Sequence, residues 1–217
     1  MPHVSMRGLS MNRPLKILLD FDGTLCKEET IPFVAERLGL DNSGEIRRLT
    51  SSAAASDADY DCNLRRRVYM MKDVKVDDFV ALISEDLLRP SLAAFVGKYS
   101  EYCEIVSCNL DCWCNPLAIR LGVKGNFTPA IVKNGKVAEI GKIVDKASLI
   151  GKFQNSGYEV VFVGDSANDI DALSKADIGI LLDNGFVSAD NLGGNIKTAV
   201  SDEEAVQFLH SLAEGTL

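Results

Sequence analysis

Short apolar runs alternate with segments of helical periodicity along most of this chain. Such runs are typical of strands buried on both faces of a parallel sheet, and apolar residues spaced three or four apart are typical of helices that pack on one. The pattern predicts strands at residues 15–19, 103–107, 159–164, 177–182 and 196–200. It predicts helices at residues 28–40, 92–99, 116–122, 145–154 and 202–213, and a loop that enters a further helix at residues 165–176.

Two segments depart from this alternation. Residues 129–140 hold two apolar runs joined by Asn-Gly at 134–135, a pair that favours the type I′ turn of a β-hairpin. Residues 41–90 show only helical signal, including a predicted helix over 76–88. Pro116 is expected in the first turn of its helix, where the missing N–H of proline is tolerated.

Strands that alternate with helices predict an α/β fold with a doubly wound, mostly parallel sheet. The helical stretch between the first two strands is too long for a single crossover, so it is predicted to be an inserted helical cap. The expected parts are a core domain of residues 14–29 and 91–217, a helical cap domain of residues 30–90, and a disordered lead-in of residues 1–13.

Composition and charge exclude several classes of function. The chain has 217 residues and a formal net charge of −8, which argues against nucleic acid as a partner, because binding to a phosphate backbone needs clustered positive charge. No apolar stretch reaches the roughly 18 residues of a membrane span, so no membrane association is expected. The six cysteines form no CxxC pair, which favours a reducing compartment, and we expect a cytoplasmic protein.

Histidine is too scarce to support several common mechanisms. The chain contains only His3 and His210, one near each end, so a Ser-His-Asp triad or a histidine-rich zinc site is not expected. Three cysteines lie close together at 108, 112 and 114, but their spacing lacks the pairs of a zinc site, and they are interpreted as small buried residues. Chemistry in this chain is therefore expected to use carboxylates, lysine and a metal ion.

Polar residues with chemical potential follow the predicted strands. They are Asp20 and Asp22 after the first strand, Ser107 at the end of the second, Lys146 on the helix after the hairpin, and Asp165 with Asp169 after residues 159–164. Ligands bind beyond the carboxyl ends of the strands in open parallel sheets, so these groups are expected to converge. Carboxylates suit Mg²⁺, a lysine and a hydroxyl suit a phosphoryl group, and a carboxylate can also act as a nucleophile.

The segments "DFDGTL", "IVS", Lys146 and "GDSANDIDAL" resemble, in this order, the four motifs of the haloacid-dehalogenase-like (HAD) hydrolase superfamily. The resemblance implies a HAD-type phosphatase with a Rossmann-like core and a cap between the first and second motifs. It implies that Asp20 is the nucleophile, and that Asp22 is first the general acid and then the base that activates water. Lys146 and a metal ion would keep Asp20 ionised.

The resemblance also implies a cofactor, Mg²⁺, and its ligands. These would be the Asp20 side chain, the backbone carbonyl of Asp22 and Asp165, with Asp169 in support. Ser107 and Lys146 would hold the phosphoryl oxygens, while Thr24 and Asn168 would position their neighbours at the substrate.

Within the superfamily the chain is most similar to the phosphoserine phosphatase-like subgroup. "DFDGTLCKEETI" matches the subgroup's first motif with Glu29 as the residue that would receive a substrate amino group, and "YDCNLRRRV" resembles the cap segment whose arginine, here Arg67, would bind a carboxylate. Each could instead be a solvated helix residue. The subgroup has Ser-Gly-Gly-Phe at its second motif, and Cys108 and Asn109 replace both glycines, which narrows the pocket and could alter the substrate.

The expected partner is thus a small phosphorylated metabolite, with phosphoserine as the first candidate. Other phosphomonoesters, such as a sugar phosphate or a nucleotide, remain alternatives. So does a phosphotransferase that uses an alcohol in place of water. A non-enzymatic alternative is a silent HAD-like domain that binds a phosphorylated metabolite, although the complete motif set argues against it. The sequence leaves the oligomeric state open.

Overall fold

The computed structural model of this chain describes residues 13–55, 60–185, 187 and 192–216. Most of the predicted lead-in, residues 1–12, lies outside the described residues. Arg13 is described, and its guanidinium forms an ion pair with Asp177 at 3.2 Å. Among the helices of the described residues, none has the length and apolar character needed to cross a bilayer.

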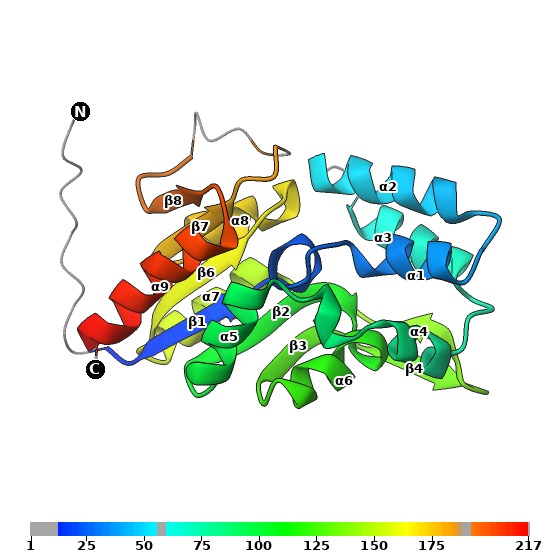
Figure 1. Cartoon of the computed structure of the whole chain (residues 1–217), viewed down its shortest axis with the longest axis horizontal. Coiled ribbons are helices and arrows are strands. Elements are labelled where there is room, and N and C mark those ends of the chain that lie inside the picture. The colour runs from blue at the N-terminus through cyan, green and yellow to red at the C-terminus, as the bar shows by residue number, and fades with distance from the viewer. Residues whose placement is uncertain (1–12, 56–59, 186, 188–191, 217) are drawn as a thin grey trace.

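A six-stranded parallel sheet forms the centre of the molecule, in the order β3-β2-β1-β6-β7-β8 (Figure 1). The strands are β1 (Leu15–Leu19), β2 (Cys103–Leu110), β3 (Lys124–Thr128), β6 (Glu159–Gly164), β7 (Ile178–Leu182) and β8 (Ile196–Ala199). Successive side chains of a strand point to opposite faces, so Ile17 and Leu19 join one apolar cluster and Leu18 joins the other. The predicted α/β fold with a parallel sheet is confirmed.

Helices cover both faces of this sheet. One face carries α5 (Pro90–Lys98), α6 (Asp111–Arg120) and α9 (Asp202–Thr216), and the other carries α7 (Lys146–Asn155) and α8 (Ile170–Lys175) (Figure 1). The α7 helix begins where Asp145 caps it, because the Asp145 carboxylate accepts a hydrogen bond of 2.8 Å from the Ser148 N–H. Each face is therefore closed by helices that the periodicity predicts.

The helical stretch between β1 and β2 forms four helices. They are α1 (Thr30–Arg37), α2 (Ser43–Ala55), α3 (Tyr60–Met70) and α4 (Val76–Leu82), followed by the 3₁₀ turn η2 (Glu85–Leu87). The first three lie together beyond the carboxyl end of the sheet (Figure 1). By contrast, α4 packs on α6, where the ring of Phe79 stacks on that of Trp113 with centroids 4.2 Å apart. The Arg120 side chain of α6 also donates 2.9 Å to the Ile83 carbonyl.

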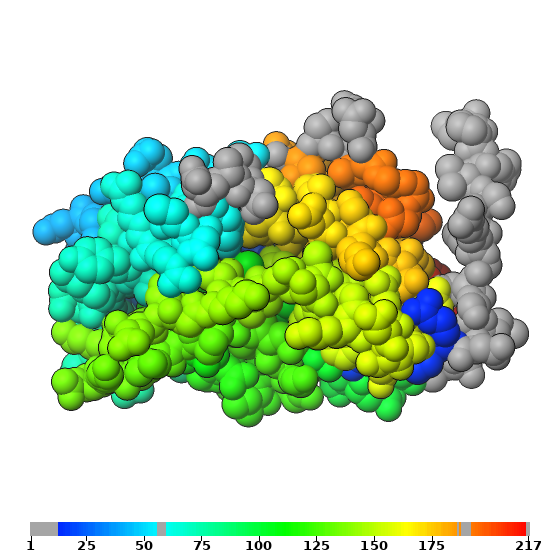
Figure 2. Space-filling view, turned by 180° about the vertical axis from the view of Figure 1, so that it is seen from behind, coloured from blue at the N-terminus to red at the C-terminus, as the bar shows by residue number. Residues whose placement is uncertain are grey.

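The predicted hairpin is present as β4 (Ala130–Lys133) and β5 (Lys136–Ile140). Both turn residues have positive φ, 52° at Asn134 and 73° at Gly135, as a type I′ turn requires. The hairpin lies along the surface beside the helical stretch (Figure 2), and the Val76 N–H donates 2.8 Å to the Gly135 carbonyl. Arg65 of α3 also donates to the carbonyls of residues 140 and 141.

Three local predictions differ from the structure. Strand β2 continues past Ser107 to Leu110, with an irregular register against β3. Helix α6 then begins at Asp111, so the prediction that Pro116 lies in the first turn is wrong and this proline lies inside the helix. Strand β3 is short, begins with an exposed residue and has a mixed sequence. It therefore has no apolar run, and the pattern misses this edge strand.

Candidate active site

The first predicted motif forms a tight turn at the centre of the sheet edge. Asp20 follows β1 directly, and its N–H donates 2.9 Å to the Val163 carbonyl of β6. The turn η1 (Phe21–Leu25) then folds back, with Gly23 at a φ of +71°. A Cβ atom at this position would lie 2.3 Å from an Asp165 carboxylate oxygen. Glycine is therefore required here both for its backbone angle and for the close approach of Asp165.

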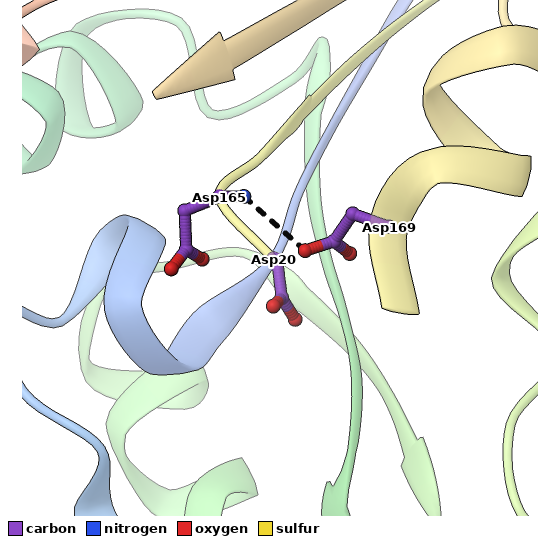
Figure 3. A group of neighbouring side chains, drawn as sticks. All are labelled: Asp20, Asp165 and Asp169. Carbon is purple, nitrogen blue, oxygen red and sulfur yellow. Dashed lines mark hydrogen bonds between the residues drawn. The ribbon is translucent and has the colours of Figure 1, made fainter. Parts of the chain in front are cut away.

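Three buried carboxylates gather at this edge of the sheet. Oxygens of Asp20, Asp165 and Asp169 all lie within 4.8 Å of one another, and the three residues are 4%, 2% and 0% exposed (Figure 3). Asp20 follows β1, whereas Asp165 and Asp169 lie between the end of β6 and the start of α8, so two segments far apart in the sequence meet here. The convergence that the strand pattern predicts is therefore present.

Two of these carboxylates are fixed by neighbouring polar groups. The Thr24 hydroxyl donates 2.7 Å to one Asp165 oxygen, and the Asn184 amide donates 2.7 Å to the other. One oxygen of Asp169 accepts from the Asp165 N–H at 3.2 Å (Figure 3) and from both the N–H and the hydroxyl of Ser166. These bonds leave little freedom to the carboxylate cluster.

Lys146 provides the positive charge of the cluster. Its ammonium lies 2.9 Å from an Asp20 oxygen and 2.6 Å from an Asp169 oxygen, and it reaches the Asn168 side chain at 3.4 Å. Burial by itself would lower the pKa of Lys146, but the Asp169 and Asp20 carboxylates outweigh burial and raise that pKa well above its usual value. Lys146 therefore stays charged.

The carboxylate cluster carries more negative charge than the Lys146 ammonium offsets. Burial raises the pKa of Asp20 well above its usual value, and the Asp169 and Asp165 charges add to this although Lys146 opposes it. Burial and Asp169 likewise raise the pKa of Asp165. Lys146 by itself does not offset the effect of burial on the pKa of Asp20, and the expectation that Asp20 is ionised involves a metal ion as well as the lysine. The cluster holds three carboxylates and one ammonium. The carboxylate oxygens are the ligand atoms that a divalent cation such as Mg²⁺ prefers.

Asp22 belongs to a separate hydrogen-bonded group. One of its carboxylate oxygens accepts from the N–H and the hydroxyl of Thr30, at 2.7 and 2.6 Å. The other accepts 2.9 Å from the side-chain amide of Asn109. Asp22 thus lies at the site but outside the carboxylate cluster.

Members of both groups line one small cavity that α1 and α3 also help to form. Its walls include Asp20, Asp22, Glu29, Tyr60, Arg67, Ser107, Asn109, Lys146, Ser166 and Asn168. The solvent-accessible volume is about 20 Å³. A larger hollow of about 560 Å³, formed by residues of β3, α6, α7 and the loop before α7, contains none of the predicted site residues.

Most of the predicted site residues line this cavity, but four do not. Asp165 and Asp169 belong to the neighbouring carboxylate cluster, Thr24 bonds to Asp165, and Cys108 is not part of the lining. The Cys108 side chain instead contacts the Tyr60 hydroxyl and the Val144 carbonyl. All six cysteines are free thiols.

Sequence reasoning missed four residues that support the site: Thr30, Tyr60, Ser166 and Asn184. Ser166 carried a detectable signal, because Ser-x-x-Asp before a helix is the spacing of a capping box, which the structure shows with Asp169. The other three act through contacts between segments distant in the chain. No local pattern could therefore have revealed them.

Arg67 is the buried member of a run of three arginines. Its exposed fraction is 3%, whereas the side chains of Arg65 and Arg66 are 43% and 57% exposed. One of its nitrogens donates 3.1 Å to the Thr50 hydroxyl. Among the described residues no acceptor pairs with its Nε atom, which is buried.

Glu29 lies directly before α1 and lines the cavity together with Arg67. Burial and the Asp22 charge raise the pKa of Glu29 to about 8, and the opposing charge of Arg67 limits this rise. The cavity wall therefore carries an acidic and a basic group in addition to Asp20, Asp22 and Lys146.

A parallel sheet with buried carboxylates and one lysine at its carboxyl edge defines a class of enzymes that act on phosphoryl or related groups with a metal ion. Residues 17–174 match the model of the haloacid dehalogenase-like hydrolase family, and the chain belongs to this family.

Relatives of this chain carry the name phosphoserine phosphatase. The chain is 30% identical over 180 residues to a phosphoserine phosphatase of Methanocaldococcus jannaschii, an alignment that covers 76% of this chain and 83% of that one. It is 31% identical over 193 residues to a phosphoserine phosphatase of Mycobacterium tuberculosis, covering 80% of this chain but only 45% of that longer protein. These matches make the chain an enzyme of the phosphatase type.

Several solved structures are similar to this chain in fold. One of them, described as a phospho-aspartyl intermediate analogue of phosphoserine phosphatase, has a TM-score of 0.67 and 26% identity, covering 79% of this chain and 87% of that one. A phosphoserine phosphohydrolase-like protein from Francisella tularensis has a TM-score of 0.72 over 90% of this chain and 99% of its own. At 20% identity, this second likeness supports the fold alone.

Substituting Gly23 tests whether the carboxylate cluster binds a cation. Gly23→Ala is expected to weaken Mg²⁺ binding by about tenfold or more, because the added Cβ displaces Asp165. Isothermal titration calorimetry with Mg²⁺ measures the change. Gly39→Ala is the matched control, since Gly39 has a similar φ of +66° but open space around it. Equal affinities in the two variants would contradict the assignment.

Proposed function

We propose that this chain is a Mg²⁺-dependent phosphomonoester hydrolase that acts on a small phosphorylated metabolite through an aspartyl-phosphate on Asp20. The observation that carries the proposal is the buried cluster of Asp20, Asp165 and Asp169 with Lys146 2.9 Å from Asp20. A nucleophilic carboxylate beside a fixed cation, at the end of a central strand, is the arrangement that phosphoryl transfer to a side chain requires.

The proposed reaction has two steps. First, an Asp20 carboxylate oxygen bonds to phosphorus while the bond from phosphorus to the alcohol oxygen breaks, and Asp22 gives its proton to that oxygen. Second, a water molecule attacks phosphorus and gives a proton to Asp22, the bond from Asp20 to phosphorus breaks, and inorganic phosphate leaves. Asp20 and Asp22 then return to their starting states.

The residues around Asp20 would stabilise the transferring group. Lys146 and the buried Ser107 hydroxyl would hold phosphoryl oxygens. The Asp20 and Asp165 side chains and the backbone carbonyl of Asp22 would hold Mg²⁺, with Asp169 in support. When bound, Mg²⁺ supplies positive charge that keeps Asp20 ionised and offsets the charge of the phosphoryl group.

Phosphoserine is the first candidate substrate. Glu29 offers an acidic partner for an ammonium group, and Arg67 offers a buried guanidinium whose Nε pairs with no group among the described residues. A buried donor without a partner is costly, and a substrate carboxylate would satisfy it. The phosphatase relatives that carry the name phosphoserine phosphatase support this choice.

Substrate entry requires the cavity to open. A volume of about 20 Å³ holds about one water molecule, so a phosphomonoester does not fit the cavity as it stands. The helices α1 and α3 carry Ile31, Tyr60, Leu64 and Arg67 over the site and are the natural moving part. The bounds of the predicted cap would place its hinges near residues 26–30 and 89–92, but the stacking of Phe79 on Trp113 argues that α4 stays with the core. We therefore propose that the second hinge lies near residues 71–75.

We also propose a cytoplasmic setting, which rests on the pattern of free cysteines.

Asp20→Asn tests the nucleophile. This variant is expected to lose measurable hydrolysis of p-nitrophenyl phosphate in Mg²⁺, because an amide oxygen does not form the aspartyl-phosphate. Release of nitrophenol measures the rate. Asp171→Asn, an exposed aspartate on α8, is the matched control and is expected to keep full activity. Undiminished turnover by Asp20→Asn would rule out the mechanism.

Arg67→Ala tests the substrate class. The variant is expected to raise KM for phosphoserine by about 10- to 100-fold, the value of a hydrogen-bonded charge pair. With phosphoethanolamine, which has no carboxylate, KM should change little. Arg66→Ala removes an exposed arginine and serves as the control. An equal loss for both substrates would show that Arg67 does not read the carboxylate.

Crystal structures with and without phosphate test the opening. In the comparison, α1, α2 and α3 are expected to move as one unit relative to the sheet, while α4 keeps its contact with Trp113. If α4 instead travels with the other three helices, the second hinge lies nearer residues 89–92. Unchanged helix positions in the two states would contradict the opening itself.

A further inference from the structure

Asp22, Thr30 and Asn109 form a closed triangle of hydrogen bonds beside the nucleophile. The Thr30 hydroxyl donates 2.6 Å to Asp22 Oδ1, and Asn109 Nδ2 donates 2.9 Å to Asp22 Oδ2. Asn109 Nδ2 also donates 2.9 Å to the Thr30 hydroxyl oxygen. Thr30 is fully buried and Asn109 is 3% exposed, while Asp22 itself is half-buried, so two of the three partners are shielded from solvent.

The orientation of the Asn109 amide is set by the backbone. Its Oδ1 atom accepts 2.7 Å from the Leu110 N–H, so this side of the amide must be the oxygen. The NH₂ group is therefore turned toward Asp22 and Thr30. Strand alternation places Ser107 and Asn109 on the same side of β2, and both line the cavity while Cys108 does not.

This network gives the two carboxylate oxygens of Asp22 different hydrogen-bond partners. Oδ1 accepts two hydrogen bonds, from the N–H and the hydroxyl of Thr30, which occupy both of its lone pairs. Among the described residues, only Asn109 donates to Oδ2, which retains a lone-pair site. A proton on the Asp22 carboxyl group therefore belongs on Oδ2.

We propose that Asn109 is a positioning residue for the general acid, and that Asp22 Oδ2 is the oxygen that transfers the proton. The inference rests on the proposed function. In the first step the proton leaves Oδ2 for the departing alcohol oxygen as its bond to phosphorus breaks, and in the second step Oδ2 takes a proton from the attacking water. The Asn109 amide and Thr30 hold the carboxyl plane so that Oδ2 meets the leaving group.

This role explains a feature that the sequence left open. Asn109 stands where the phosphoserine phosphatase pattern has glycine, and a direct contact with substrate was one interpretation of the exchange. Its amide nitrogen is already committed to Asp22 and Thr30. The replacement of glycine by Asn109 therefore affects the general acid Asp22 rather than the binding of the alcohol part of the substrate.

The test compares leaving groups. The leaving alkoxide of phosphoserine needs a proton to depart, whereas the phenolate of p-nitrophenyl phosphate departs without one. Asn109→Ala is therefore expected to lower kcat/KM for phosphoserine by about tenfold or more beyond any loss for p-nitrophenyl phosphate. A merely structural defect would slow both substrates alike. Asn126→Ala, an asparagine of β3 outside the cavity, is the control and should keep the wild-type ratio.

Thr30 provides a second pair of variants that does not depend on the folding of Asn109→Ala. Thr30→Val removes the hydroxyl at nearly the same volume and should reproduce the selective loss, while Thr30→Ser keeps the hydroxyl and should restore the ratio. Equal losses for both substrates in Asn109→Ala and Thr30→Val would overturn the inference and leave the proposed function intact. A wild-type protein that hydrolyses neither substrate would overturn the proposed function itself.

Discussion

The ion pairs of Lys146 with Asp20 and Asp169 are the interaction on which the rest of the site depends. Taking several charges out of water costs several kcal/mol for each ion, and attraction between them offsets this only when the geometry is good. Here one ammonium bridges two carboxylates at hydrogen-bonding distance, and a third carboxylate, Asp165, remains in excess. The fold therefore holds an excess of negative charge that a divalent cation can balance.

Space for this charge cluster comes from two glycines at the ends of β1 and β6. A side chain on Gly23 would collide with Asp165, and one on Gly164 would lie 2.6 Å from the Asp169 carboxyl carbon. Because the parallel strands end at the same edge, a small residue at each end lets carboxylates from separate segments approach within 4.8 Å. The apolar clusters on both faces of the sheet keep these strand ends in register.

Part of the cavity wall comes from the helical insertion. Its helices bring Tyr60 and Arg67 over the nucleophile, and Thr30 at the start of α1 fixes Asp22. The insertion is not uniform, since α4 packs on the core through Phe79 and Trp113 whereas α1 to α3 lie beyond the sheet. An enzyme that must admit a charged substrate and then exclude water benefits from such a division.

The sequence by itself determined the parallel sheet, the inserted helices and the convergence of Asp20, Asp22, Ser107, Lys146, Asp165 and Asp169, because buried strands and strand-end motifs are local signals. It missed β3, whose short edge sequence has no apolar run, and it placed the start of α6 too late. Only the tertiary structure decided which arginine of three is buried, and it revealed that Asn109 bonds Asp22 across 87 positions of sequence. Burial and hydrogen bonding between distant segments are set by packing, and no local pattern of residues encodes them.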